Sequence, residues 1–566
     1  MENQRLILFL ALSLVILFLW DAWQEKNAPQ REIVAQQGTA QPQLPSETAV
    51  APAPAEATAA SQDLPEAAPA EPVVPAAEKE RKAVRKAALG SKQRIRVVTD
   101  VLDVDIDTLG GDLRRAYLEE FPVSPDKPDE AYPLMDDRLP QLFIAQSGLL
   151  ANGPAPDHYA VYQAEKTEYV LAPGQDELKV PLTWTSPEGI TVTKTYTFRR
   201  GDYLIQLDHQ VSNQSQQDWN GRLYRQFQRT EYDEVGKSRL LYTFTGGAVS
   251  TPNKPYEKIS FEDMADWRPE QSYVEGGWVA MLQHYFVAAW IAGKNEVNHF
   301  YTRSVNNERY ILGMTGKEVS IAPGESHDFP AELYVGPKDQ DRLAQIEPNL
   351  RLTVDYGMLS FIAQPLFWLL QTIHTFVGNW GWAIVILTFL IKLAFYPLSA
   401  ASYRSMANMR KLAPKFQAIR ERYGDDRQRM TQATMELYKK EKINPMSGCW
   451  PMLVQIPVFI ALYWVLLESV ELRQAEFILW IKDLSAKDPY YILPLLMGAS
   501  MYVQQKLSHN PSIDPMQQKI LQFLPIVFTL FFMLFPAGLV LYWVVNNILS
   551  ILQQWYITRK IEQASR

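Results

Sequence analysis

The chain has 566 residues, enough for several domains, and a formal net charge of −8. From residue 401 onward nineteen Lys and Arg stand against twelve Asp and Glu, so this part carries +7 and the first 400 residues carry −15. The single cysteine, Cys449, excludes an intramolecular disulfide and a cysteine-based metal cluster. The seven histidines form no HExxH motif and no glycine-rich nucleotide loop is present, so we expect no metal, no cofactor and no enzyme.

The N-terminal region predicts a membrane anchor followed by a tether. No charge lies between Arg5 and Asp21, which predicts a cytoplasmic N-terminus over 1–4 and a transmembrane signal anchor over 5–23. A cleaved signal peptide is the rival interpretation, but no small-x-small cleavage site follows closely. Residues 24–93 hold nine prolines between Pro29 and Pro75, which predicts a disordered periplasmic linker rather than a ligand for a binding module.

Residues 94–340 predict a large periplasmic antiparallel β-sandwich. Polar and apolar residues alternate in the stretches that begin at Val101, Ile190 and Tyr203, and glycine-containing turns separate such stretches. The apolar run 278–292 predicts strands that pass through the core. No catalytic constellation is evident, so a scaffold is favoured, with sugar or peptide binding left open.

Lys392 is the most informative residue of the second half. No Asp, Glu, Lys or Arg lies between Asp355 and Lys392, or between Lys392 and Arg404. An ammonium within a span costs a few kcal/mol unless it meets water or a polar partner. Arg404 lies about 18 Å away along a continuous helix at ~1.5 Å per residue, so we expect a wet cavity inside the bilayer. Snorkelling of Lys392 to the inner interface is the alternative, and an early helix end at Pro397 would favour it.

Charge-free lengths and helix breakers predict the remaining organisation. Residues 401–446 hold eleven Lys and Arg against five Asp and Glu, which places this segment in the cytoplasm by the positive-inside rule. With the anchor, six transmembrane helices are expected and both termini are cytoplasmic. We predict an interfacial amphipathic helix over 355–378, transmembrane helices over 379–401, 447–468, 490–507, 519–536 and 538–557, a basic helical hairpin over 402–446, a periplasmic loop over 469–489, a cytoplasmic loop over 508–518 and a cytoplasmic tail over 558–566.

Several motifs are similar to those of one known family. They include Val377-GNWGWA-Ile384, Met406-ANMRKLAPKFQAIRERYGD-Asp426, Asn444-PMSGCWPMLVQIPV-Phe459, Asp488-PYYIL-Pro494 and Phe535-PAGLVLY-Trp543. In these motifs the chain resembles the bacterial members of the YidC/Oxa/Alb family of membrane insertases. The resemblance covers essentially the whole chain. It implies an inner-membrane insertase and folding chaperone, acting alone or with the Sec translocon, with a periplasmic domain like that of Gram-negative members.

The resemblance and the residues together define a candidate substrate groove. The family usually has arginine where this chain has Lys392, which keeps the charge but loses bidentate carboxylate binding. Thr388 lies one helical turn before it. Tyr542 and Trp543 resemble family positions that contact substrate. The other predicted groove residues are Gln455, Gln504 and Asn546, for which an interhelical hydrogen bond is the alternative role.

The resemblance implies macromolecular partners and no small-molecule substrate. Nascent membrane proteins, the Sec translocon with its accessory subunits, the ribosome or the signal recognition particle receptor, and membrane lipid are expected. The residues expected to recruit partners in the cytoplasm are Arg410, Lys411, Lys415, Arg420, Arg422, Arg427 and Arg429. Binding to anionic lipid would explain the same charges. A secondary transporter that uses an intramembrane lysine is the competing function, and a membrane-anchored periplasmic binding module is another.

Overall fold

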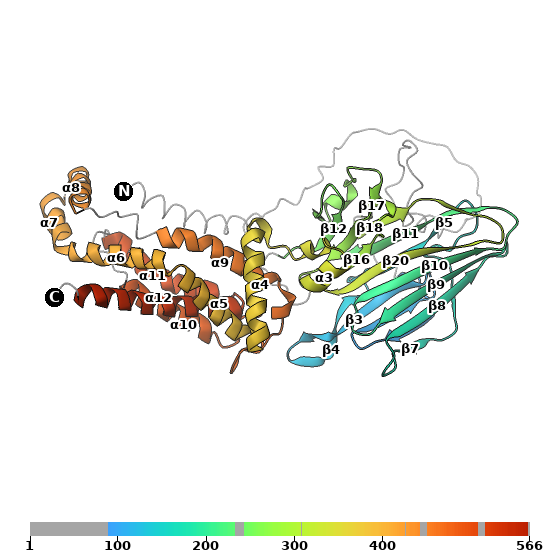
Figure 1. Cartoon of the computed structure of the whole chain (residues 1–566), viewed down its shortest axis with the longest axis horizontal. Helices are drawn as coiled ribbons and strands as arrows, with labels where there is room; N and C mark the ends of the chain where they lie inside the picture. Colours follow the sequence, from blue (N-terminus) through green and yellow to red (C-terminus); the bar gives the residue numbers. More distant parts are fainter. Residues whose placement is uncertain are drawn as a thin grey trace, which may run out of the picture.

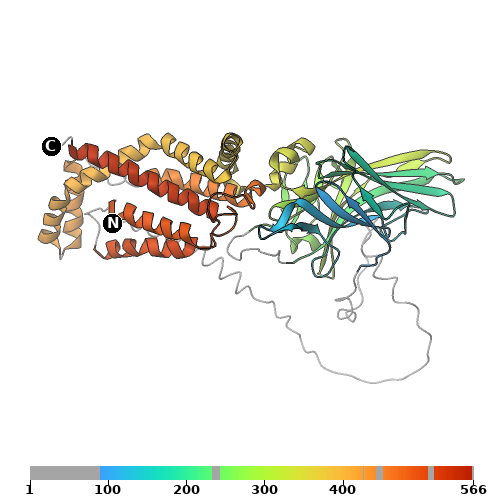
Figure 2. The ribbon, with the colours of Figure 1, turned by 90° about the horizontal axis from the view of Figure 1, so that it is seen from below.

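The computed structural model describes residues 89–232, 243–306, 308–424, 426–441, 450–507 and 515–563. These residues form a β-sandwich and a bundle of helices, which follow one another along the long axis of the molecule (Figure 1). A view from below shows the same two parts side by side (Figure 2). The anchor predicted at 5–23, and the linker predicted at 24–93 up to residue 88, lie outside the described residues.

The sandwich consists of two sheets around one hydrophobic core, as predicted. One sheet has eleven strands in the order β14-β17-β18-β11-β5-β3-β2-β1-β7, with β19 beside β11 and β4 beside β3. The other has nine strands in the order β13-β12-β15-β16-β20-β10-β9-β8-β6. The strands are β1 (Arg94–Val98), β2 (Leu102–Asp107), β3 (Asp112–Ser124), β4 (Lys127–Met135), β5 (Phe143–Ala151), β6 (Gln163–Ala164), β7 (Glu168–Val170), β8 (Glu177–Thr185), β9 (Ile190–Arg199), β10 (Leu204–Asn213), β11 (Trp219–Thr230), β12 (Gly246–Ser250), β13 (Glu257–Ile259), β14 (Val274–Glu275), β15 (Trp278–Leu282), β16 (Phe286–Ile291), β17 (Val297–Val305), β18 (Arg309–Gly316), β19 (Val319–Ile321) and β20 (Ser326–Pro337).

The alternation of the sequence explains the strands. In β9 the residues at every second position from Ile190 to Tyr196 are buried, which is the period of a strand with one face on the core. The turns before and after β9 contain Gly189 and Gly201, both at positive φ, where glycine meets no Cβ clash. Every residue of β15 and β16 is buried, which confirms that 278–292 crosses the core.

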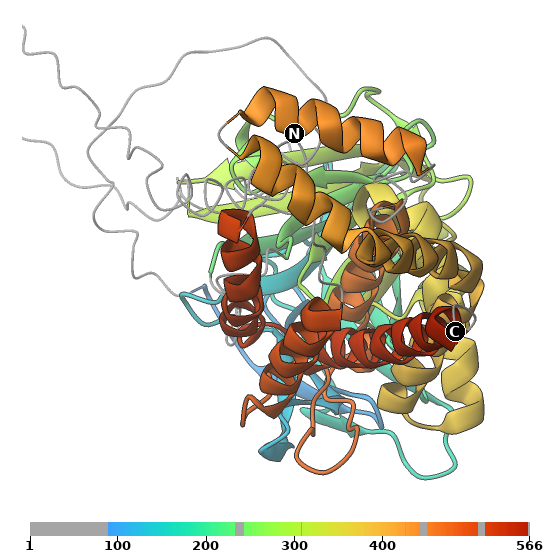
Figure 3. The same cartoon turned by 90° about the vertical axis from the view of Figure 1, so that its left-hand side faces the viewer.

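The helices of the second half are α3 (Gln340–Ile346), α4 (Ser360–Val377), α5 (Trp380–Ala394), α6 (Tyr396–Lys411), α7 (Ala413–Tyr423), α8 (Arg427–Lys440), α9 (Trp450–Glu468), α10 (Ile492–Leu507), α11 (Pro515–Phe532) and α12 (Ala537–Gln563). They divide between the two parts: α3 packs on the sandwich through Leu343, and those from α4 onward form the bundle. Figure 1 shows α5, α9, α10, α11 and α12 running along the long axis, with α7 and α8 at the end far from the sandwich. Seen from that end, α7 and α8 lie in front of the bundle (Figure 3).

Helix α4 lies across the axis of the bundle, at the end next to the sandwich (Figure 1). Its buried face consists of Ala363, Phe367, Leu370 and Ile373, spaced by three or four residues, and it packs on α5 and α9. Pro365 is inside the helix, whereas Gly378 ends it at a φ of 69°. The Asn379 side chain then accepts a hydrogen bond from Trp382 N at 3.1 Å and begins α5.

The helix that carries Lys392 is shorter than expected. The α-helix α5 ends at Ala394, and α6 begins at Tyr396 with a bend of 65° between them. Pro397 occupies the first turn of α6, where its missing N–H costs no helical hydrogen bond. The continuous helix from Lys392 to Arg404 is therefore wrong, whereas the transmembrane span over 379–401 stays a prediction that now includes a bend. The distance argument along one axis does not apply, and α6 takes up the start of the segment expected as the hairpin.

The length and hydropathy of each described helix show whether it could cross a bilayer by itself. Among the described helices, none by itself has eighteen residues of sufficient hydropathy to cross a bilayer, although α5 and α6 meet this criterion together across their bend. The stretches Val454–Glu468 and Gln522–Phe532 are apolar but shorter.

Polar contacts join the sandwich to the bundle. The helix α3 bridges the two parts, because the indole N–H of Trp278 donates at 3.0 Å to Glu347 Oε2 at the end of α3, and the Gln340 side chain of α3 donates to the Tyr356 hydroxyl at 2.6 Å. His284 Nε2 lies 2.9 Å from the carbonyl oxygen of Leu467 at the end of α9. Lys258 and Asp355 form an ion pair. The β-sandwich is thus held against the bundle through α3, His284 and Lys258.

Candidate functional site

Lys392 lies near the end of α5 and its side chain is directed at α12. Its Nζ donates a hydrogen bond to the Ser550 hydroxyl at 2.8 Å, and this hydroxyl donates to the carbonyl of Asn546 at 2.7 Å. Within the described part of the chain, Lys392 has no carboxylate within ion-pair distance. The ammonium is therefore oriented by a neutral group, and its charge is left available.

A second polar contact extends the site to α9. The Gln455 side chain donates to Asn546 Oδ1 at 2.8 Å. We call Lys392, Gln455, Asn546 and Ser550 the polar cluster, which draws its members from α5, α9 and α12. Asn546 and Ser550 are four residues apart, so one face of α12 presents both.

The other predicted groove residues are not joined to the polar cluster by hydrogen bonds. The Thr388 hydroxyl donates to the carbonyl of Ile384 at 2.6 Å, and the residue is only 1% exposed. Gln504 is half-buried on α10, and over the described residues no hydrogen bond connects it to the cluster. Instead Asn547 donates to Ser500 of α10 at 3.1 Å.

Tyr542 and Trp543 lie in an aromatic layer of the bundle. The Tyr542 ring stacks on Phe459 with centroids 6.1 Å apart, and Trp543 meets Phe459 edge-on at 5.0 Å. Trp543 also contacts Phe532 of α11 at 5.7 Å. These rings pack α9, α11 and α12 together one to two turns before the polar cluster along α12.

The basic residues of the predicted recruitment surface gather on α7, α8 and the end of α6. Lys411, Lys415, Arg420, Arg422 and Arg429 are exposed. The hairpin of α7 and α8 is closed by Phe416 against Tyr438, with centroids 5.5 Å apart, and by the ion pair of Lys415 with Glu441 at 2.6 Å. Arg410 and Arg427 lie in α6 and α8, and their side chains are outside the described part.

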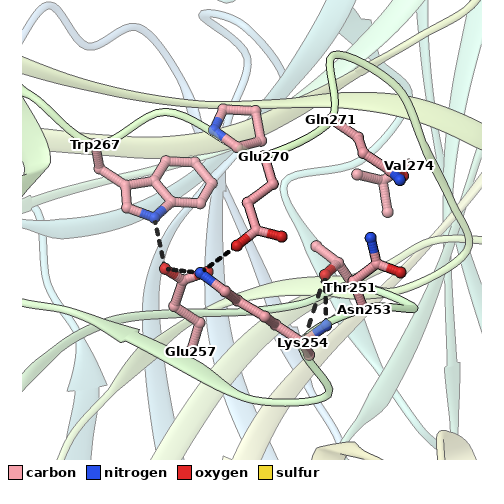
Figure 4. Close-up of a pocket in the computed structure, with 9 residues that line it drawn as sticks. Thr251, Asn253, Lys254, Glu257, Trp267, Glu270, Gln271 and Val274 are labelled. Atoms are coloured by element: carbon pink, nitrogen blue, oxygen red, sulfur yellow. Dashed lines mark hydrogen bonds and ion pairs between the residues drawn. The ribbon is translucent and has the colours of Figure 1, made fainter.

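A shallow pocket of the sandwich offers a different candidate site. It lies beside β13 and β14, and Trp267, Lys254, Glu257 and Glu270 are among its lining residues (Figure 4). Lys254 Nζ lies 2.8 Å from Glu270 and 3.3 Å from Glu257, and the Trp267 N–H points at Glu257. The charged groups of this pocket thus pair with one another.

Buried polar residues of the sandwich went unpredicted. Lys194 on β9 is fully buried, and its Nζ donates to the carbonyls of Gly110 and Ser147 at 3.0 and 3.1 Å. Burial raises the pKa of the nearby Asp112 carboxyl to about 6, although Arg114 and Lys194 oppose this shift. Burial also lowers the pKa of Lys194 to about 8. The sequence pattern could have predicted the burial of Lys194, because this residue alternates in phase with the inward-facing Ile190 and Tyr196.

In the ranges that the structure describes, no three His, Cys, Asp or Glu side chains are placed to hold a metal ion.

Comparisons with known proteins match both parts of the chain. A family model described as the YidC periplasmic domain matches residues 94–369, and one described as the 60Kd inner membrane protein matches residues 372–564. The membrane protein insertase YidC of Thioalkalivibrio sulfidiphilus is 55% identical over 100% of both chains, and that of Nitrosococcus oceani is 52% identical over 100% of both. A crystal structure of an active YidC insertase, 17% identical, covers 83% of this chain and 93% of its own with a TM-score of 0.40.

The two family models and the insertase relatives define the class as an inner-membrane protein with a periplasmic domain, and this class is not enzymatic. The chain belongs to the YidC family of membrane protein insertases. The relatives are named insertases, so they give the transporter alternative no support.

Proposed function

We propose that this protein inserts nascent membrane proteins and that the polar cluster receives the polar flank of the entering segment. The observation that carries the proposal is the Lys392 ammonium, which is hydrogen-bonded to Ser550 and has no described carboxylate partner. A substrate carboxylate is the group that would complete this arrangement.

The physical need is to bring a polar flank across an apolar slab. A charged side chain at the centre of a bilayer costs on the order of a few kcal/mol, and hydrogen-bond donors with a complementary charge lower that cost. Apolar residues of the substrate have no such requirement and pass into lipid. The exposed apolar side chains of α11, among them Phe523, Val527 and Leu530, suit a surface in contact with lipid or with such a segment.

The two ends of the molecule suit opposite sides of the membrane. The matched periplasmic domain lies at one end, and the basic hairpin lies at the other (Figure 1). We place the hairpin and the C-terminus in the cytoplasm, α4 in the outer interface, and the anchor at 5–23 as the first of six spans. The exposed face of α4 carries Phe361, Trp368 and Phe376, which fits a helix in contact with lipid.

The same orientation suggests where partners bind. The basic hairpin faces the compartment of the ribosome and the signal recognition particle receptor, so it suits recruitment of either. The Sec translocon and its accessory subunits would meet the membrane-embedded helices or the sandwich. Membrane lipid contacts the apolar helix faces.

Reconstitution tests the function directly. The purified full-length protein in liposomes should protect the translocated acidic flank of a single-span substrate from added protease, and protein-free liposomes should not. Protection that is equal with and without the protein would remove the proposal. Solute exchange without flank protection would revive the transporter alternative.

A further inference from the structure

The connection between α9 and α10 is a folded element organised by two carboxylates. Asp483 Oδ1 accepts hydrogen bonds from the backbone N–H groups of Gln474 at 3.0 Å and Ser485 at 2.8 Å. Asp488 is only 1% exposed, and its Oδ2 accepts from Leu493 N at 2.7 Å, in the first turn of α10. Its Oδ1 accepts from the Trp480 indole at 3.0 Å. We call residues 469–491 the closing loop.

The backbone of the closing loop adopts conformations that need support. Gln474, Leu479 and Tyr491 have φ values of 57°, 58° and 56°, a region that residues with a side chain rarely occupy. Such conformations persist where the surroundings hold them, and they cluster at functional elements. The hydrogen bonds of Asp483 and Asp488 lie directly beside these positions.

The closing loop is hydrogen-bonded to the start of α5 and to the start of α12. The Asn379 side chain, between α4 and α5, donates to the carbonyls of Glu476 and Phe477 at 3.1 and 3.3 Å. A Cβ on Gly381 would lie 2.0 Å from the Phe477 ring, so this glycine allows the ring to reach α5. At the start of α12, Ala537 N donates to Ala486 O at 2.7 Å, and Gly538 N to Leu484 O at 2.9 Å.

The closing loop also fills the bundle core. Its residues Leu472, Ile481 and Leu484 are 1%, 4% and 2% exposed and belong to the same apolar cluster as Ile384 and Leu387 of α5. Apolar residues of α5 and of the loop thus pack together at this end of the bundle, beside the buried polar residues Glu468, Ser469 and Asp488.

The sandwich braces the loop from its other side. Arg473 and Gln474 both donate to the carbonyl of Pro122 in β3, at 2.8 and 2.9 Å. The Arg473 guanidinium also lies over the rings of Tyr132 and Phe286, 5.3 and 5.4 Å from their centroids.

The polar cluster lies further along the helices from this end. Lys392 follows the start of α5 by twelve residues, a rise of about 18 Å at ~1.5 Å per residue, and Asn546 follows the start of α12 by nine, about 13 Å. Thr388 of α5 lies between the closing loop and Lys392, so its position reports on access from the side of the loop.

We propose that the closing loop is the seal that keeps the polar cluster shut toward the periplasm, and that Asp488 is its main positioning residue. This proposal rests on the proposed function for the presence of a cluster that must be sealed. A nascent flank would then reach the cluster from the cytoplasmic side, while ions from the periplasm are kept out.

The test measures sealing in the full chain without any substrate. A cysteine replaces Thr388 in a Cys449→Ser background, and a membrane-impermeant thiol reagent is added from the periplasmic side. With the native loop we expect only slow labelling, whose rate is the reference. Asp488→Asn removes an acceptor of charge-assisted hydrogen bonds, so we expect labelling to become at least about tenfold faster.

Two further variants complete the test. Phe477→Ala frees the contact with Gly381 while keeping both carboxylates, and it should also speed labelling. Lys482→Ala changes an exposed lysine of the same loop and should leave the rate unchanged. Rates for Asp488→Asn and Phe477→Ala that equal the native rate would overturn the proposal. Because labelling needs no insertion, a sealed but inactive protein would contradict the proposed function alone.

Discussion

Lys392 on α5 and Ser550 on α12 meet across 158 positions of sequence through a hydrogen bond of 2.8 Å. The hydroxyl holds the ammonium in place without neutralising it, and Asn546, one turn before Ser550 on α12, accepts a hydrogen bond from Gln455 of α9. An ammonium that is oriented but unneutralised can attract an anion that arrives later, which is the role that we assign to the polar cluster.

Substitution of Lys392 should separate charge from packing. Lys392→Arg keeps the charge and should retain insertion, whereas Lys392→Ala and Lys392→Glu should slow insertion of an acidic-flank substrate by at least about tenfold. The measurement is protease protection of the translocated flank, supported by complementation of growth. Normal growth with Lys392→Glu would contradict the role.

Two controls belong to this experiment. Insertion of a substrate with a neutral flank should slow less in these variants, because such a flank offers no carboxylate for Lys392 to attract. Lys506→Ala removes an exposed lysine of α10 that lies over Tyr502 and should leave insertion unchanged.

The polar cluster should be reachable from the cytoplasm. Single cysteines at Thr388 and Asn546, in a Cys449→Ser background, should react with an impermeant thiol reagent supplied from the cytoplasmic side, because polar groups near Lys392 require water. A cysteine at the exposed Phe523 of α11, which we propose contacts lipid, gives the unreactive reference. Equal reaction from both sides would indicate a channel.

The sequence predicts the elements well where one simple period governs them. Ile190 to Tyr196 alternate in polarity because one face of β9 is on the core, and Gly189 and Gly201 mark turns that need positive φ. Lys392 stands out because it is the only charge in a long apolar segment.

The sequence fails where a contact depends on distant partners. Ser550 carries no charge and Thr388 bonds to its own helix, so neither the partner of Lys392 nor the role of Thr388 follows from spacing. The bend after Ala394 depends on how α6 packs on α12 and α9, which Pro397 permits but does not dictate. The alternation of β9 places Lys194 on the core face, but its partners, the carbonyls of Gly110 and Ser147, are distant in sequence.

Removal of the basic hairpin should stop insertion but leave the bundle intact. The deletion should begin after α6, because Ala400, Ala407 and Met409 of α6 are buried in the bundle. Helices α7 and α8, in contrast, contact mainly each other. Replacing Ala413–Lys440 by a short Gly/Ser linker should abolish insertion while the protein remains in the membrane at its normal level. A charge-reversal variant of Arg420 and Arg422 keeps the hairpin and should weaken recruitment alone. Insertion at the normal rate after the deletion would move recruitment to the tail around Arg559 and Lys560.

The buried carboxyl of Asp112 should make the stability of the sandwich depend on pH. Its pKa in the folded protein, about 6, lies above its ordinary value of 3.8, so the folded state binds more protons than the unfolded state between these values. The contribution of Asp112 to the free energy of unfolding should therefore rise as pH falls from about 7 to 5, by roughly 1 to 2 kcal/mol. Asp112→Asn keeps the shape but cannot titrate, so its unfolding free energy should vary less over this interval. Urea unfolding of the full chain in detergent, followed by tryptophan fluorescence, measures the difference between the two proteins. An identical pH dependence for both would show that the Asp112 carboxyl does not titrate in this range.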